Sequence, residues 1–147
     1  MKEVFISVVS LHAYGTDEED RVEFSTDGVY QFDGEVGRLD YFETEVTGMQ
    51  GTRTCVFIYP DKVIVDRQGT VTSRMEFSDG SRNSFIYNTP YGDATLSIKT
   101  RRITRDLHAD GGRLELEYVI DVEHAVVARN KFIVEIKEQK LGEFING

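Results

Sequence analysis

Residues 113–123 read Arg-Leu-Glu-Leu-Glu-Tyr-Val-Ile-Asp-Val-Glu, and this stretch decides the fold class. Apolar residues occupy every second position from Leu114 to Val122, and all but one of the remaining positions are charged. Because side chains of a β-strand point alternately to opposite faces, the pattern predicts a strand with one buried face and one wet face. A helix would spread the same apolar residues around its whole surface.

Similar period-two runs fill the rest of the chain. We expect further strands at 4–11, 21–25, 29–32, 39–46, 52–59, 62–67, 71–77, 83–87, 94–107 and 130–137. Asp-Gly pairs at 27–28, 33–34, 79–80 and 110–111 favour tight turns, and prolines 60 and 90 mark two more. Connections this short leave no room for crossover helices, so the neighbouring strands must be antiparallel.

These strands predict an all-β fold, a single antiparallel up-and-down β-barrel of about eight to ten strands that spans residues 1–147 as one domain. A barrel is favoured because closure removes the sheet edges that promote aggregation. A two-sheet sandwich is the alternative, and its long connection would have to be Ala13–Asp20. Short helices are candidates only at Glu18–Val22 and Gln139–Ile145.

The composition limits the classes of partner. A formal net charge of −9 over 147 residues repels phosphate backbones and anionic lipids, so we expect neither nucleic-acid nor membrane binding, although a local basic patch remains compatible with it. The single cysteine, Cys55, lies in an apolar run (Cys55–Ile58), which predicts a buried reduced thiol and fits a cytoplasmic location.

Three segments resemble a known family. They are residues 43–52 (Glu-Thr-Glu-Val-Thr-Gly-Met-Gln-Gly-Thr), residues 87–92 (Tyr-Asn-Thr-Pro-Tyr-Gly), and the stretch from 112–118 through 130–136. Together they are similar to the YwiB-type family of uncharacterised bacterial proteins. The resemblance implies a cytoplasmic barrel with a lipocalin-like (calycin) fold. It transfers no catalytic or binding residue, and the chain has no Trp with which to make the Gly-x-Trp signature of true lipocalins.

No motif in the sequence indicates an enzyme, a cofactor or a metal. His12, His108 and His124 lack companions at metal-ligand spacing, and two of them would not complete a zinc site. The acidic run at 17–20 lacks the spacing and central glycine of a calcium loop. The glycine-bounded turn at 48–51 has neither a lysine nor a following helix with which to bind phosphate. We therefore interpret these features as surface or loop elements.

The basic residues Lys99, Arg101, Arg102 and Arg105 suggest a register for the last long hairpin. If residues 110–112 form the loop, the cross-strand pairs are 105–117, 101–121, 99–123 and 103–119, three of them with opposite charges on the outer face. Cross-strand salt bridges would then explain the basic run.

That register places Thr100, Arg102 and Thr104 on the inner face, together with Tyr118. We therefore hypothesise that these four residues form a ligand-binding site, where Arg102 meets an internal carboxylate such as Asp106 or an anionic ligand. The alternative is a β-bulge between Ile98 and Ile103 that turns Arg102 towards solvent.

Two functions remain open. One is a barrel that binds a small anionic or amphipathic molecule in its lumen or at its mouth. The other is a non-catalytic protein-interaction or assembly module whose core is filled. Polar groups that converge on an unfilled lumen would favour the first function, and large side chains that fill the lumen would favour the second.

Overall fold

The structure is a computed structural model that describes residues 1–14, 18–122 and 125–139. It contains ten β-strands and one short 3₁₀ helix. The elements are β1 (Lys2–Tyr14), β2 (Glu18–Phe32), β3 (Gly37–Phe42), η1 (Glu45–Thr47), β4 (Thr52–Ile58), β5 (Val63–Gly69), β6 (Ser73–Phe77), β7 (Arg82–Thr89), β8 (Gly92–His108), β9 (Gly111–Val122) and β10 (Ala125–Glu138). In the described part of the chain, no helix is long and apolar enough to cross a bilayer.

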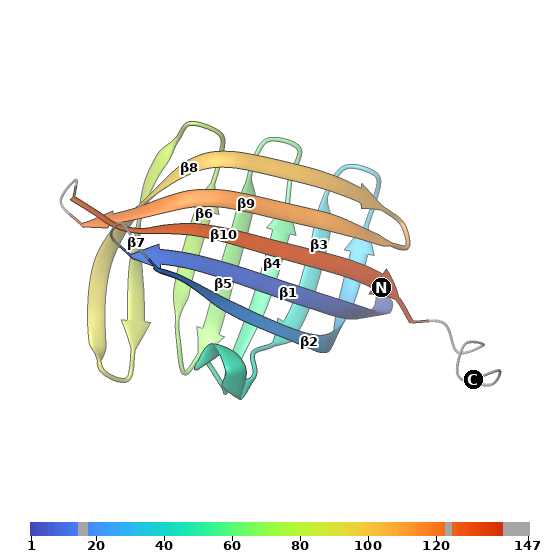
Figure 1. The fold of residues 1–147 in the computed structure, drawn as a ribbon. Helices are drawn as coiled ribbons and strands as arrows, with labels where there is room; N and C mark the ends of the chain where they lie inside the picture. The colour runs from blue at the N-terminus through green and yellow to red at the C-terminus, as the bar shows by residue number, and fades with distance from the viewer. Residues whose placement is uncertain (15–17, 123–124, 140–147) are drawn as a thin grey trace.

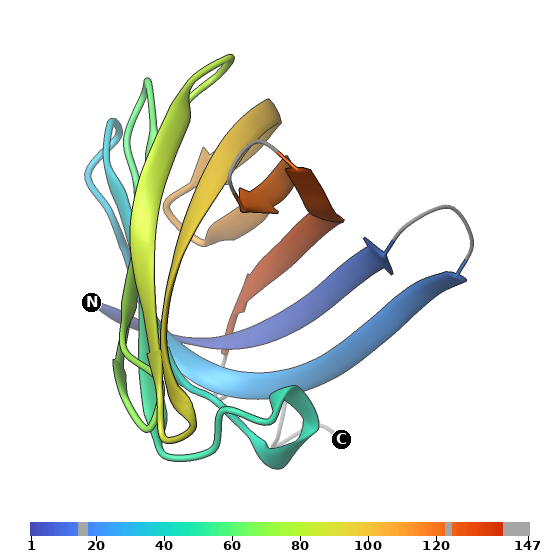
Figure 2. The same cartoon turned by 90° about the vertical axis from the view of Figure 1, so that its left-hand side faces the viewer.

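The strands form one antiparallel sheet in the order β6-β5-β4-β3-β2-β1-β10-β9-β8-β7. The long strands β1, β2, β8, β9 and β10 cross in front of the shorter strands β3 to β7 (Figure 1). The sheet curls so that its end strands, β6 and β7, meet at a bridge between Thr72 and Asn88. In the β6–β7 turn, at the other end of β6, the N–H of Gly80 donates to the carbonyl of Thr100 of β8 at 3.2 Å. The predicted all-β antiparallel barrel is confirmed, and it is nearly closed (Figure 2).

The first hairpin differs from the prediction. β2 is one continuous strand from Glu18 to Phe32, so neither the short helix at Glu18–Val22 nor the turn at residues 27–28 is present. Gly28 is needed for close packing, because a Cβ there would lie 2.3 Å from Ile6 and 2.6 Å from the carbonyl oxygen of Asp40. The expected irregular segment at 13–20 is also wrong, since β1 and β2 pair as far as Tyr14 and Glu18. The other helix candidate, Gln139–Ile145, lies outside the described residues except for Gln139.

The predicted register of the β8–β9 hairpin is wrong as well. The turn is formed by residues 109 and 110, and His108 pairs directly with Gly111. Gly111 and Gly112 both belong to β9, where the backbone of neighbouring strands leaves no room for a side chain. A Cβ on Gly112, for example, would lie 2.2 Å from the carbonyl oxygen of Asp106. Further along, the register shifts between Thr100 and Arg102, which confirms the β-bulge that was the alternative prediction.

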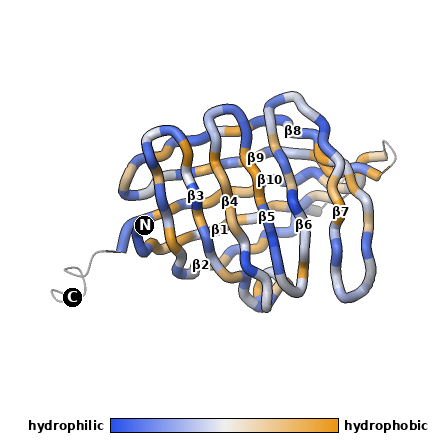
Figure 3. Tube along the Cα trace, turned by 180° about the vertical axis from the view of Figure 1, so that it is seen from behind, coloured by the Kyte–Doolittle hydropathy of each residue, from blue (hydrophilic) through white to orange (hydrophobic). Residues whose placement is uncertain are grey.

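The barrel core consists of the inward side chains of all ten strands. Alternation of hydropathy is visible along the tube in Figure 3. The buried apolar residues are Val4, Ile6, Val8, Phe24, Tyr30, Leu39, Tyr41, Val56, Ile58, Val63, Val65, Met75, Phe77, Phe85, Ile98, Leu114, Leu116, Phe132, Val134 and Ile136. Leu114 and Leu116 are fully buried, as the opening stretch of the sequence predicts.

Polar contacts close one end of the barrel. The hydroxyl of the fully buried Tyr30 donates to the carbonyl of His108 at 2.9 Å, and burial raises the pKa of Tyr30 to about 12. Arg105 pairs with Leu114 and so lies on the inner face, where its guanidinium donates to the carbonyls of Tyr59 and Glu35. Arg105 thus ties together the β2–β3 and β4–β5 connections.

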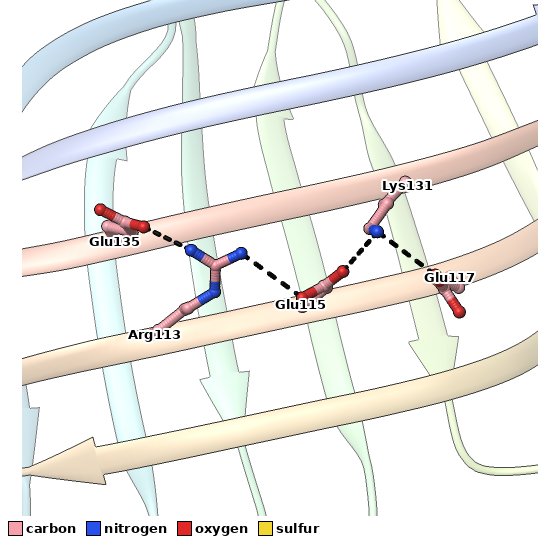
Figure 4. Close-up of polar contacts among 5 residues, drawn as sticks. All are labelled: Arg113, Glu115, Glu117, Lys131 and Glu135. Carbon is pink, nitrogen blue, oxygen red and sulfur yellow. Dashed lines mark hydrogen bonds and ion pairs between the residues drawn. The ribbon is translucent and has the colours of Figure 1, made fainter.

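The acidic outer face of β9 pairs with residues of β10. Lys131 lies 2.7 Å from Glu115 and 3.4 Å from Glu117, while Arg113 bridges Glu115 and Glu135 (Figure 4). Among the described residues the expected salt bridges between β8 and β9 do not form, because the actual register sets Arg105 against Leu114 and Lys99 against Val119. Glu123, the expected partner of Lys99, lies outside the described residues. Exposed pairs of this kind contribute at most about 1 kcal/mol each.

Cys55 lies on the outer wall, paired with Asp40, and is half-buried, not in the core. The alternation of β4 explains the position: Val56 and Ile58 point inward, so Cys55 and Phe57 point outward. Burial and the neighbouring Asp40 carboxylate raise the pKa of the Cys55 thiol to about 12.

The core assignment of β9 can be tested with two variants of neighbouring residues. Leu116→Ala should lower the free energy of unfolding by about 2–5 kcal/mol, because it leaves a void in a fully packed layer. Glu117→Ala, on the outer face, should change it by less than about 1 kcal/mol. Urea denaturation of both variants measures the difference, and equal effects would contradict the inward direction of Leu116.

The raised pKa of Cys55 predicts slow alkylation of the folded protein at pH 8, since only the thiolate reacts. Denaturant should restore the rate of an ordinary thiol. The variant Asp40→Asn should react faster than the parent while still folded, because one of the groups that raise the pKa has lost its charge. A folded parent protein that reacts as fast as the denatured one would refute the assignment.

Candidate functional site

The inner face changes from apolar to polar along four adjacent strands, β3 to β6. Tyr41 of β3 pairs with Thr54 of β4, Thr54 pairs with Arg67 of β5, and Arg67 pairs with Ser73 of β6. These four residues, directly opposite one another on neighbouring strands, are called the polar row below. Glu43 lies two residues beyond Tyr41 and is also buried.

Two members of the polar row have a buried polar atom without a hydrogen-bond partner in the described part of the chain. They are the Nε of Arg67 and the hydroxyl of Ser73. Tyr41, Thr54 and the buried Glu43 interact with one another through side-chain hydrogen bonds. A buried polar group without a partner costs about 1–3 kcal/mol. Two such atoms on directly paired residues therefore indicate that the site is not organised for stability alone.

Burial controls the charges at this site. It raises the pKa of Glu43 above its usual range, and the nearby charge of Arg67 opposes only part of that rise. Burial also raises the pKa of Tyr41, which is therefore a neutral hydroxyl near pH 7. The site thus combines a guanidinium that is always charged with a carboxyl group whose pKa is raised by burial.

The polar row borders a pocket of about 430 Å³ inside the barrel, called the lumen pocket below. Its lining combines side chains from both walls of the barrel and from η1. They are Ser10, His12, Val22, Thr47, Met49, Arg67, Met75, Phe85, Tyr87, Leu96, Tyr118, Ile120, Ala128, Asn130 and Phe132. A pocket of this size is large enough for one small organic molecule.

The wall that faces the polar row also carries polar groups. His12 of β1 and Asn130 of β10 are a cross-strand pair, and His12 Nδ1 lies 2.5 Å from the side-chain oxygen of Asn130. Ser10 lies two residues before His12 and therefore on the same inner face of β1. Polar side chains therefore reach the lumen pocket from opposite sides of the barrel.

The structure separates the four site residues predicted from the sequence. Tyr118 lines the lumen pocket and packs edge-on against Phe77, with ring centroids 4.8 Å apart. Thr100 is buried and pairs with Tyr118, but it is not part of the lining. Arg102 and Thr104 are exposed on the outer wall, so their predicted inward direction is wrong: the bulge beside Arg102 changes which residues face inward.

The other residues considered for metal or ion binding are scattered. His108 is exposed, Glu19 and Asp20 are exposed in β2, and His124 and Asp17 lie outside the described residues. Among the described residues, no group of three or more His, Cys, Asp or Glu side chains is placed to hold a metal ion.

The signal for the polar row is present in the sequence and was missed. Along the inward positions of β5, Val63 and Val65 are followed by Arg67, and along those of β4, Ile58 and Val56 are followed by Thr54. Each change is small by itself, and only the pairing of the strands shows that the changes fall side by side.

A second pocket, of about 450 Å³, lies beside Asp40 and Arg53. The positive charge in its lining is already paired, because Arg53 lies 3.1 Å from Asp40, and Arg38 lies 3.0 Å from the same carboxylate. We therefore regard the lumen pocket, with the unpaired Nε of Arg67 in its lining, as the candidate site.

The burial of Glu43 predicts an unusual pH dependence of stability. In the unfolded chain this carboxyl titrates near 4.5, and in the folded protein it titrates higher. The stability that it contributes is therefore present below pH 4.5 and is lost as the pH rises through the raised pKa. The variant Glu43→Gln, which stays neutral, should become progressively more stable relative to the parent as the pH rises.

Glu115→Gln is the matched control, because its hydrogen bond with Lys131 lowers the pKa of Glu115. This variant should lose stability relative to the parent as the pH rises through that lowered pKa. Chemical denaturation at several pH values measures both trends, and trends of the same sign would show that Glu43 is not held in a desolvated site.

Comparison with known proteins agrees with this architecture. The chain is 28% identical over 118 residues to the "Uncharacterized beta-barrel protein YwiB" of Bacillus subtilis (strain 168), a match that covers 78% of this chain and 82% of that protein. The crystal structure of the ywiB protein from Bacillus subtilis superposes with a TM-score of 0.82 at 22% identity, over 95% of this chain and 93% of the other. The model of a domain of unknown function, DUF1934, matches residues 6–133, and the chain therefore belongs to the DUF1934 family.

Proposed function

We propose that this protein binds one small amphipathic molecule in the lumen pocket. The observation that carries the proposal is the buried Nε of Arg67, which has no hydrogen-bond partner in the described part of the chain and belongs to a side chain that lines the pocket. Such a group is costly in an empty site and becomes useful when a ligand supplies the partner.

The two sides of the pocket match the two parts of an amphipathic molecule. Arg67, Asn130 and His12 offer polar contacts, while Phe85, Phe132 and Leu96 offer an apolar surface. Binding sites for small molecules commonly combine a mostly apolar lining with a few well-placed polar groups.

The alternative function, a protein-interaction module, was tied to a filled barrel. The end of the barrel near Tyr30 and Leu114 is filled, because both side chains are fully buried. The other end retains the lumen pocket. The pocket and its unpaired polar atoms favour the small-molecule function over the interaction module.

The fluorescent dye 8-anilinonaphthalene-1-sulfonate tests the proposal, since it is a small amphipathic molecule. We expect saturable binding of one dye per chain. The variant Ser10→Phe places a ring into the pocket and should abolish this binding. The variant Ser25→Phe, with the same change at an exposed position of the neighbouring strand β2, should leave it intact.

Because the dye also binds partly folded proteins, near-UV circular dichroism must show that both variants remain folded. Dye binding that is equally strong in folded Ser10→Phe and in the parent would place the dye outside the lumen and overturn the proposal.

A further inference from the structure

Arg67 has a charge that the protein itself does not neutralise at ion-pair distance. The ion pairs formed within the described part of the chain do not include it. Its Nη1 lies 3.7 Å from the sulfur of Met75, and its Nε has no partner there. A thioether sulfur is a weak acceptor, so the guanidinium retains most of its capacity to bind an anion.

Charge counting indicates one negative charge on the ligand. Arg67 is the one permanently charged side chain in the described lining of the lumen pocket. Glu43, the acid whose charge acts on Arg67, is buried, and burial favours its neutral form. Because Arg67 carries the single permanent positive charge of this lining, it can neutralise one negative charge of a ligand. A dianion would bring a second charge without a counterion next to a carboxyl group.

The hydrogen-bonding groups around Arg67 suit a planar anion. A guanidinium binds a carboxylate through two parallel N–H···O bonds, and this geometry is specific for planar groups. The hydroxyl of Ser73 belongs to the residue that pairs with Arg67 on β6, and it has no partner in the described residues.

The remaining lining indicates the body of the ligand. Four aromatic side chains, those of Phe85, Tyr87, Tyr118 and Phe132, line the pocket together with Leu96 and Ile120. Aromatic rings pack favourably against other rings, in stacked or edge-on arrangements. The ligand body that fits best is therefore flat and apolar.

We propose that the lumen pocket binds an aromatic monocarboxylate, with its carboxylate paired to Arg67 and its ring against the aromatic side chains. This inference rests on the proposed function and names the chemical class of the ligand. It makes Arg67 the residue that determines specificity.

The test compares three probes by isothermal titration calorimetry at pH 7: 2-naphthoate, the neutral 2-naphthalenemethanol, and the dianionic 2-naphthyl phosphate. The parent protein should bind 2-naphthoate at least about tenfold more tightly than either of the others, as expected for a charge-assisted pair. Arg67→Met should remove this preference while still binding the neutral alcohol, and Arg67→Lys should retain part of it.

Arg102→Met is the matched control, because Arg102 is an exposed arginine on the outer wall. It should bind all three probes as the parent does. Unfolding midpoints of the Arg67 variants establish that they are folded, and the binding of the neutral alcohol to them gives a second check that the pocket is intact.

The outcomes separate the two proposals. Equal affinity of the parent for 2-naphthoate and the alcohol, with both blocked by Ser10→Phe, would overturn the carboxylate inference and leave the lumen pocket as a binding site. A loss of the preference in Arg102→Met and not in Arg67→Met would also overturn it. Failure of all three probes and of the fluorescent dye to bind would overturn both proposals.

Discussion

The pairing of the first strand with the last is the interaction on which the rest of this barrel depends. β1 and β10 pair over ten consecutive residues, from Val4 opposite Glu138 to Ala13 opposite Arg129. The other strand pairs of the sheet join neighbours in the sequence. Without the β1–β10 ladder the strands would form two separate sheets, β1 to β6 and β7 to β10, and the two walls of the lumen pocket would not face each other.

This ladder also explains how a polar site arises from ordinary strands. It brings His12 and Asn130 together as direct neighbours, although they are 118 residues apart in the sequence. The polar row on β3 to β6 lies across the lumen from them and lines the same pocket through Arg67. The barrel is therefore divided along its length into a packed end, where Tyr30 and Leu114 are fully buried, and an end with unpaired polar groups.

Local patterns predicted much of the fold because a strand shows its alternation within a few residues. The stretch at 113–123 identified both the strand and its buried face, and Leu116 is fully buried as expected. Register was harder to predict. Charge matching placed Arg105 opposite Glu117, yet it lies opposite Leu114 because Gly111 and Gly112 serve close packing between strands and not the turn. The lipocalin-like relationship and the cytoplasmic location remain predictions.

The candidate site was largely invisible in the sequence for a related reason. The prediction that Arg102 points into the barrel is wrong, because Arg102 lies on the outer wall, and the arginines on the inner face are Arg67 and Arg105. A single inward threonine such as Thr54 is unremarkable on one strand. Its meaning comes from Tyr41 and Arg67 on the strands beside it, and that information exists only once the strands are paired.

β1 and β10 are paired in the barrel but lie near opposite ends of the sequence, and this has a consequence for the synthesis and folding of the protein. During synthesis β1 emerges first, and one of its edges remains without a partner until residues up to Glu138 have been translated. Contacts between such distant residues slow folding, because the loss of chain entropy precedes the gain from pairing. Until then the apolar inner face of β1, with Val4, Ile6 and Val8, is available to other chains. Rapid synthesis of its last third, or a chaperone that shields the early strands, would therefore raise the yield of folded protein.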